Sequence, residues 1–403
     1  MSEIRRARRI RHTGRGSQIR IYLGKQLRFF INESDWKVLP MAAVIAGLVA
    51  MVIRRRFFVN MEGSLIGAFA LTCVAIWNGC FNSIQAVCRE RAIIKREHRS
   101  GMHISAYMAA HMIYQFLLCA AQTALTMFVL RQLDVPIPKG YGSGLITPWM
   151  ICDLGLTMFL ISYASDMLSL FLSSVSRTTT GAMTLMPFIL IFQLVFSGGI
   201  IPLPEWSRPI SEFTISNYGI RALASQSGYN ELPMTSVWNT VSGMRGSEIE
   251  ETVTIGEILD KLDSPVITKH RDAEVINNAT VAETAKLFGV PEELAEEILK
   301  DNSQDEAVTL GMIVDLMKQN EALQQQRDRT ITLKATVGEM IDLLGEENVR
   351  ETIQQKTAAA AYKPEYKNSV GNIAGNWAVL CLFILGFAML ATIVLEMIDK
   401  DKR

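Results

Sequence analysis

A run of charged residues between two apolar stretches is the part of the sequence best suited to chemistry at an interface. The segment Arg89–Tyr107 contains nine Arg, Lys, Glu and His side chains. Basic and acidic residues alternate within it, in the order Arg89, Glu90, Arg91, and later Arg96, Glu97, His98. Pairs of this kind form hydrogen-bonded contacts across an interface that shifts without dissociating. A solvated turn would not need this order, so we interpret the segment as a protein-contact site.

Two acidic residues inside an apolar run form a second candidate site. Asp153 and Asp166 both lie in the fourth apolar run of the chain. An ionisable group inside a membrane is a functional hypothesis by default, here substrate or proton binding. The alternative for Asp153 is a position near the outer interface, beside Trp149. Thirteen residues separate the two carboxyl groups, which places them on different faces of a helix.

No motif predicts a metal or a nucleotide bound by the chain itself. His98, His103 and His111 do not share a helical face, as ligands of one metal ion would. The phosphate-binding pattern G-x-x-x-x-G-K-[ST] does not occur in the sequence. We therefore expect no metal site, no bound cofactor and no catalytic residue in this chain, and we expect no nucleic-acid partner.

The elements that position these residues are predicted to be membrane-spanning helices. Hydrophobic residues make up 49% of the chain, and several runs reach the roughly 18 residues needed to cross about 30 Å of hydrocarbon. The sequence predicts an all-α polytopic membrane protein with six spans, which are Val38–Ile53, Ser64–Cys88, Ile104–Leu130, Leu145–Val175, Gly181–Ile201 and Ile373–Met397. The fourth is too long for one straight span, and we expect it to be tilted or preceded by an interfacial turn.

The distribution of positive charge predicts the orientation of these spans. Residues 1–37 hold ten Arg and Lys against three acids, and basic flanks stay in the cytoplasm. Six spans then leave both termini cytoplasmic in the plasma membrane, with segment 89–103 inside and residues 226–370 outside. Only Arg54–Arg56 conflict with this orientation, because they would face outward. Their long side chains can extend to the lipid headgroups. Residues 16–37 read as an amphipathic helix in contact with lipids at the inner membrane surface.

The polar segment 226–370 is predicted to be a separate acidic domain, followed by the last span and tail at 371–403. It carries 14 basic and 26 acidic residues. Four similar strings begin at Thr254, Thr280, Thr309 and Thr336, and three of them match the Thr-x-x-Glu capping box. We expect an extracytoplasmic domain of helical hairpins, inserted between the fifth and sixth helices. A binding or spacer module is favoured over an enzyme, with an extracellular protein as a possible partner.

Several motifs together resemble one family. The charged segment is preceded by Asn78-Gly79-Cys80-Phe81-Asn82-Ser83, and Phe196-Ser197-Gly198 and Tyr218-Gly219-Ile220-Arg221-Ala222-Leu223 follow the fifth run. This order resembles type-2 ATP-binding-cassette (ABC) exporters, especially the membrane domain of the G subfamily. The resemblance covers about residues 16–225 and the last span. It implies helices 1–5 within residues 38–225, with a re-entrant outer segment at 200–225.

The resemblance also implies roles for individual residues. A coupling helix that contacts a cytoplasmic ATPase would comprise Arg89, Glu90, Arg91, Arg96, Glu97, His98, Arg99, Ser100 and Gly101. Residues facing a substrate cavity would be Asn78, Phe81, Asn82, Leu190 and Leu194. The alternative for the α-helical Asn and Phe positions is packing and hydrogen bonding between helices. The family's paired leucines after the FSG string are Gly199-Ile200 here, which puts an outer plug in doubt.

The expected function is that of a permease subunit of an ABC exporter. It would move an amphiphilic or peptide/lipid-like substrate outward, powered by a separate ATPase subunit that holds ATP and Mg. A second permease copy, or a related permease, would complete the pathway. The alternative is a mechanotransmitter that does not transport, whose outer domain regulates or binds an extracellular partner.

Overall fold

The computed structural model describes residues 14–32, 35–199, 203–271, 274–276, 308–319 and 324–397. The chain divides into two compact units. Unit 1 comprises Met1–Met234 and Ala358–Arg403, and unit 2 comprises Thr235–Thr357. The second unit is therefore shorter at both ends than the expected 226–370 domain.

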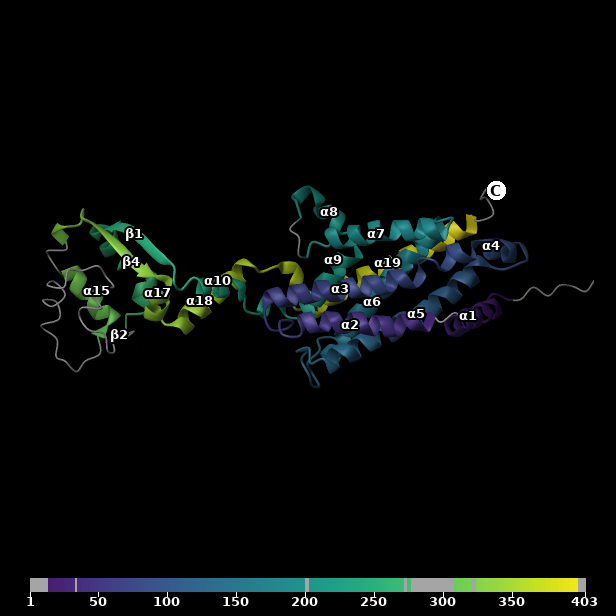
Figure 1. Cartoon of the computed structure of the whole chain (residues 1–403), viewed down its shortest axis with the longest axis horizontal. Helices are drawn as coiled ribbons and strands as arrows, with labels where there is room; N and C mark the ends of the chain where they lie inside the picture. Colours follow the sequence, from purple (N-terminus) through teal and green to yellow (C-terminus); the bar gives the residue numbers. More distant parts are fainter. Residues whose placement is uncertain are drawn as a thin grey trace, which may run out of the picture. The chain divides into compact units, whose positions relative to one another are not determined.

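Unit 1 is a bundle of helices (Figure 1). Its main helices are α1 (Arg15–Asn32), α2 (Val38–Ile53), α3 (Met61–Ser83), α4 (Ala86–Arg99), α5 (Ile104–Gln132), α6 (Met150–Val175), α7 (Thr179–Val195), α9 (Ile215–Gln226) and α19 (Val370–Glu396). Shorter helical pieces are η1 (Asp35–Lys37), η2 (Glu205–Ser207), α8 (Arg208–Ser211), η3 (Tyr229–Glu231) and η4 (Pro364–Tyr366).

Five of the described helical segments are long and apolar enough to cross a membrane. They contain α2, α3, α5, α6 and α19, which are five of the six expected spans. The fifth expected span, Gly181–Ile201, corresponds to the shorter helix α7. α7 ends at Val195, before the expected Ile201, and the chain turns further at Gly198, which has a positive φ of 68°.

Two other span boundaries differ from expectation by five residues. The second span was expected to run to Cys88, but α3 ends at Ser83 and α4 begins at Ala86 after a two-residue turn. The fourth was expected to begin at Leu145, but α6 begins at Met150, after an ordered turn. The charged segment is consequently a helix in its own right, joined directly to α3.

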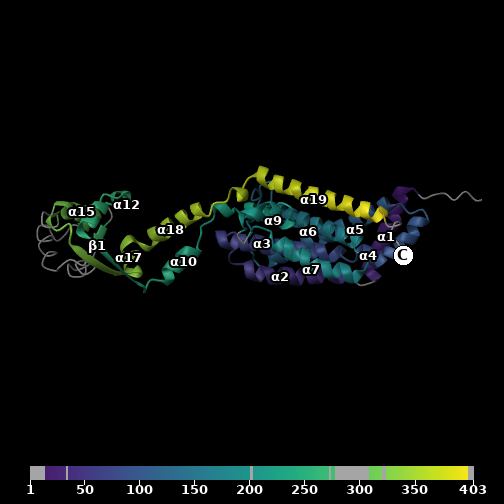
Figure 2. The same ribbon diagram turned by 90° about the horizontal axis from the view of Figure 1, so that it is seen from above.

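Helix α6 is the hub of unit 1. It packs against α3, α5, α9 and α19, which run beside it in both views (Figures 1 and 2). Every residue from 160 to 170 is buried. Ser165 and Ser169 donate from their hydroxyls to the backbone oxygens of Ile76 and Cys80 on α3, at 2.9 and 2.7 Å. These bonds and the shared core fix α3 and α6 as one rigid pair.

The close approach of α3 to α6 depends on a glycine. A Cβ added at Gly79 would lie 2.1 Å from the backbone oxygen of Ser162. Any larger residue would therefore force the two helices apart. Helix α9 is also almost entirely buried against this pair. The re-entrant position expected for residues 200–225 stays a prediction, and residues 200–202 lie outside the described part.

Unit 2 mixes short helices with strands, where purely helical hairpins were expected. Its helices are α10 (Ser236–Gly243), α11 (Ile255–Lys261), α12 (Pro265–Lys269), α15 (Leu310–Gln319), α17 (Val337–Leu344) and α18 (Glu346–Ala360), the last of which continues past the unit boundary. Its strands are β1 (Glu248–Thr254), β2 (Glu274–Ile276), β3 (Val308–Thr309) and β4 (Thr330–Thr336). β1 pairs antiparallel with β4, and β2 pairs antiparallel with β3.

The predicted capping boxes are confirmed at two of the repeats of unit 2. Thr254 and Thr336 each form the expected reciprocal capping box, with Glu257 and Glu339. The copy at Thr309 continues into α15. The copy at Thr280, and its continuation at 287–299, lies outside the described residues. Each described copy begins with a strand, because the β-branched residues before the threonine pair with another repeat.

Two repeats lock each other in a reciprocal manner. In the first repeat, the Gly256 N–H donates to the backbone oxygen of Arg327, which precedes the last repeat, at 2.9 Å. In the last repeat, the Gly338 N–H donates to the backbone oxygen of Arg245, which precedes the first repeat, also at 2.9 Å. The side chains repeat the exchange, because Arg245 pairs with Asp342 and Arg327 pairs with Asp260. The β1–β4 pair is therefore approximately two-fold symmetric.

Candidate functional site

The candidate site centres on α4, the helix formed by the charged segment. Its N-terminus lacks a cap from its own Gln85. Instead, the Ser173 hydroxyl of α6 accepts hydrogen bonds from the backbone N–H groups of Val87 and Cys88, at 3.0 and 3.1 Å. Free N–H groups in the first turn need such an acceptor. A side chain of α6 thus caps the N-terminus of α4 and fixes where α4 begins.

A second contact ties α4 to the same, C-terminal end of α6. Arg91 donates to the backbone oxygens of Ser174 and Ser176, at 2.7 and 3.3 Å. These carbonyls belong to the C-terminal turn of α6, where a cation is favourable. Arg91 is therefore turned inward, toward α6.

Helix α1 holds α4 on another side. The Lys25 ammonium lies 3.1 Å from the Glu90 carboxylate, which is almost fully buried. The Tyr22 hydroxyl donates to Glu97 at 3.0 Å. Burial, together with the bond to Glu97, raises the pKa of Tyr22 above its usual value, so the phenol stays a donor. Both acids of α4 are thus bound by α1.

The turn from α4 into α5 is closed by Gln18 of α1. The side chain of Gln18 donates to the Gly101 oxygen at 3.2 Å and accepts from the His103 N–H at 2.9 Å. Gly101 has φ 103°, a conformation that side-chain-bearing residues rarely adopt. His98 contacts the Met102 oxygen at 3.0 Å. One glutamine therefore spans the whole turn.

The outward face of α4 is basic, not mixed in charge. Its exposed residues are Arg89, Ala92, Ile93, Arg96, Arg99 and Ser100. Glu97 was expected to be held by arginines of the segment and to accept from a partner. Its carboxylate accepts from Tyr22 of α1, and its contact with a partner stays a prediction. A partner would meet arginines around a small apolar centre.

The residues expected to face a substrate cavity have different surroundings. Asn82 exchanges hydrogen bonds with Gln122 of α5, at 2.8 and 3.1 Å. Leu190 is buried, Leu194 and Asn78 are half-buried, and Phe81 is 52% exposed. The packing alternative therefore describes Asn82 best, whereas Phe81 is open to a lipid or a partner.

Asp166 sits in a polar cluster between three helices. Ser83 of α3 donates to one carboxyl oxygen at 2.5 Å, and Gln115 of α5 donates to Ser83 at 2.8 Å. The other carboxyl oxygen of Asp166 and the side-chain oxygen of Gln115 have no hydrogen-bond partner among the described residues. Substrate or proton binding at Asp166 stays a prediction.

Asp153 has a structural task that the sequence did not reveal. Its carboxylate accepts from the backbone N–H groups of Leu145, Ile146 and Thr147, at 2.8, 3.0 and 2.8 Å. It is 1% exposed, and the three N–H donors disperse its charge. Asp153 and Asp166 therefore do not form one site, in agreement with their different helical faces.

The three histidines lie in different surroundings. His111 contacts Gln26 and the Tyr107 hydroxyl, both at 2.9 Å, and is buried. His98 lies against Met102 as described above, and the His103 side chain is exposed. The four polar residues of α1 that hold this region are Gln18, Tyr22, Lys25 and Gln26. Their spacing fits one helical face, a signal that the sequence contained but that we assigned to the membrane surface.

Comparisons with known proteins agree with this architecture. The family model for the ABC-2 type transporter matches residues 18–226. An ABC transporter ATP-binding/permease protein of Mycobacterium tuberculosis is 27% identical over 201 residues, which cover 47% of this chain and 23% of that protein. The matched region holds α1 to α9, and with it every contact that fixes α4.

Proposed function

The chain belongs to the ABC-2 type transporter family, and from this premise we propose that it is the permease subunit of an ABC exporter. Its ATP and Mg would be bound by a separate ATPase subunit. The substrate would be amphiphilic or peptide/lipid-like and would move outward. Transport is favoured over mechanical transmission because both comparisons are with transporters.

The observation that carries the proposal is the fastening of α4 on two sides. Ser173 and the α6 carbonyls hold one side, and Lys25 and Tyr22 of α1 hold the other. A force on α4 therefore cannot simply rotate this helix in place. It must move α1 and α6 with it, since each bond would otherwise break at a cost of about 1–3 kcal/mol.

Helix α6 provides the route from α4 into the membrane. Its packing against α3, α9 and α19 means that displacement of its C-terminal end is shared by these helices. Packed helices move as rigid elements rather than deforming continuously. ATP-driven motion at α4 would thus change the surface that α3 and α7 present to a second permease copy.

The exposed face of α4 indicates the chemistry of the ATPase surface. Arg89, Arg96 and Arg99 surround Ala92 and Ile93. An acidic groove with an apolar floor would complement this face, because Arg pairs with carboxylates through two parallel bonds. We propose that the basic face of α4, defined by these five residues, is the ATPase contact.

A second permease copy is proposed because unit 1 exposes aromatic side chains from two neighbouring helices. Trp77 and Phe81 of α3 are 43% and 52% exposed, and Phe188 of α7 is 68% exposed. One bundle gives half of a pathway, and two such faces would enclose one. We further propose that unit 2 lies outside the cytoplasm, with both termini inside.

Charge reversal tests the ATPase contact. Arg96→Glu should weaken copurification of the ATPase and reduce stimulated ATP hydrolysis, because an acid would face an acidic groove. Arg55→Glu is the matched control, an exposed arginine before the start of α3, at the end remote from α4. If both variants retain the ATPase equally, the basic face of α4 is not the contact.

A further inference from the structure

The loop that joins α5 to α6 forms a pocket that the proposed transport mechanism does not use. The pocket holds about 400 Å³ and is lined mainly by Arg131, Val135, Ile137, Lys139, Trp149 and Ile151. It lies at the C-terminal end of α5, whose 29 residues begin beside α4. A helix of that length rises about 44 Å, so the pocket and α4 belong to opposite faces of the membrane.

The pocket is built rigidly on the side of α5. The helix ends in a Schellman motif, in which the Val135 N–H donates to the Leu130 oxygen at 3.2 Å and the Asp134 N–H donates to the Arg131 oxygen at 3.4 Å. Asp134 takes the left-handed conformation that this motif requires, with φ 51°. Val135 and Ile137 are then buried and anchor the loop.

The loop is equally fixed on the side of α6. Asp153 binds three consecutive backbone N–H groups of the loop, as described above. Ser143 donates to the Gly140 oxygen at 2.9 Å and accepts from the Met150 N–H at 3.1 Å. The Gly142 N–H donates to the Pro148 oxygen at 2.8 Å. The pocket is thus held in shape before any ligand arrives, which lowers the cost of binding.

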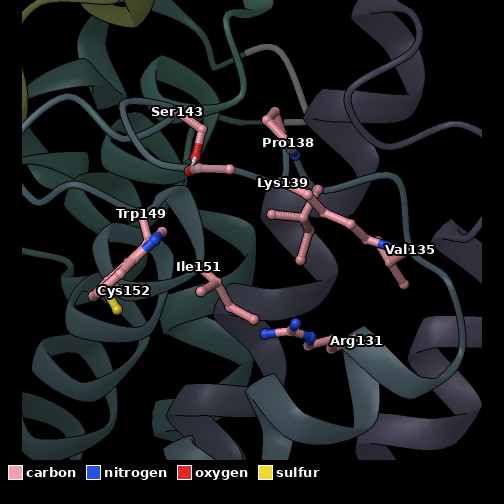
Figure 3. A pocket seen from close by; sticks show the side chains of 10 residues that line it. Arg131, Val135, Pro138, Lys139, Ser143, Trp149, Ile151 and Cys152 are labelled. Atoms are coloured by element: carbon pink, nitrogen blue, oxygen red, sulfur yellow. Dashed lines mark hydrogen bonds between the residues drawn. The ribbon is translucent and has the colours of Figure 1, made fainter.

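The pocket presents an exposed cation that can bind an anion. The Arg131 side chain makes no hydrogen bond or ion pair with any residue that the structure describes. Figure 3 shows its guanidinium directed toward Ile151, with Trp149 and Cys152 across the cavity. Lys139 adds a second positive charge, 3.9 Å from Asp134 in an exposed pair. A guanidinium with free donors binds a phosphate oxygen pair well.

The walls of the pocket indicate an amphiphile rather than a free ion. Val135, Ile137 and Ile151 are apolar and at least half-buried. Trp149 is 50% exposed and lies edge-to-face with Tyr141, at 6.3 Å between ring centroids. Exposed aromatic residues at the ends of spanning helices mark the headgroup level of a bilayer. A ligand that carries a phosphate beside apolar chain would contact both features.

We infer that this pocket binds the phosphate group of an anionic phospholipid, with Arg131 as its main ligand. The lipid would hold the α5–α6 loop at the membrane face remote from the ATPase. The inference rests on the membrane-spanning fold and not on the transported substrate, so it can fail while the proposed function stands.

Native mass spectrometry of the full-length protein in detergent tests this site. Phosphatidylglycerol should bind the unmodified protein and Arg55→Ala alike, and should bind Arg131→Ala at least about tenfold more weakly, because one charge-assisted bond of about 1.4 kcal/mol or more is lost. Arg55 is exposed and does not line the pocket. Arg131→Gln, which keeps most of the side chain, should behave as Arg131→Ala does.

One further measurement separates the two sources of phosphate. Inorganic phosphate at a concentration equal to the lipid should not displace it, because a free ion cannot contact the apolar walls. Complete displacement would overturn the lipid assignment in favour of a free anion. Equal lipid affinity for Arg131→Ala and Arg55→Ala would overturn the site itself.

Discussion

Lys25 of α1 and Glu90 of α4 form a largely buried ion pair of 3.1 Å, with side-chain exposures of 26% and 7%. The Tyr107 hydroxyl of α5 also donates to this carboxylate, at 3.4 Å. One acid therefore joins three helices where the charged segment meets the membrane bundle. This junction makes α1 a part of the coupling region rather than a helix that only lies on lipid.

Loss of the lysine should release α1. Lys25→Met leaves the buried Glu90 without its cation, which costs about 3 kcal/mol. Hydrogen exchange of the α1 backbone should accelerate accordingly. Adding Glu90→Gln should restore part of the protection, because no unpaired charge then remains. Lys139→Met is the control, since Lys139 makes only an exposed 3.9 Å pair and its loss should leave α1 unchanged.

The cap that α6 supplies to α4 can be tested one serine at a time. Ser173→Ala removes the acceptor of two N–H groups and should destabilise the start of α4 by about 1–2 kcal/mol. Exchange at Val87 and Cys88 should rise. Ser174→Ala is the control, because the Ser174 hydroxyl donates to the Leu170 oxygen within its own helix. Unchanged exchange in Ser173→Ala would contradict the capping role.

The capping boxes of unit 2 predict a local stability effect. Thr336→Ala should lower the free energy of unfolding of a 235–357 fragment by about 1 kcal/mol, the usual scale for an N-cap. Urea unfolding followed by circular dichroism measures it. Thr240→Ala, which loses only a bond to the Ser236 oxygen within its helix, should have a smaller effect. Equal midpoints for the two variants would count against the cap.

The first capping box also predicts a pH dependence. The bonds from the Thr254 backbone and side chain lower the pKa of Glu257 below its usual 4.5. A lowered folded-state pKa means that the stabilisation is present above the unfolded value and is lost as pH falls through the folded value. The urea midpoint of the fragment should therefore drop below about pH 4.5. Glu257→Gln should flatten that drop, and an unchanged profile would exclude the bond.

Much of the membrane unit could be predicted from the sequence because local signals define it. The span Val38–Ile53 coincides with α2, since its apolar run is flanked by polar residues on both sides. The end of α7 was harder to place, because the apolar run continues beyond Val195, where the helix ends. The expected fourth span, Leu145–Val175, is too long for one straight span, and its length predicted either a tilt or a turn before it. The structure has a turn before α6.

The contacts that define the site could not be predicted in the same way. Ser173 caps Val87 and Cys88, from which it is separated by 86 and 85 positions along the chain. No local sequence pattern identifies such a serine. The strands of unit 2 did leave a signal, because Thr330–Thr336 alternates polar and apolar residues up to the capping threonine. That alternation was overlooked because the helical half of each repeat has the stronger pattern.

The most direct test of the central claim is a crosslink from the basic face of α4. A photoreactive amino acid at Ile93, which is 39% exposed, should capture the ATPase subunit in membranes that contain both proteins. The same amino acid at Phe213, which is 74% exposed and lies outside the α4 region, should not. A crosslink from position 93 alone is the result that the account predicts. No ATPase crosslink at position 93, or equal crosslinks from both positions, would contradict it.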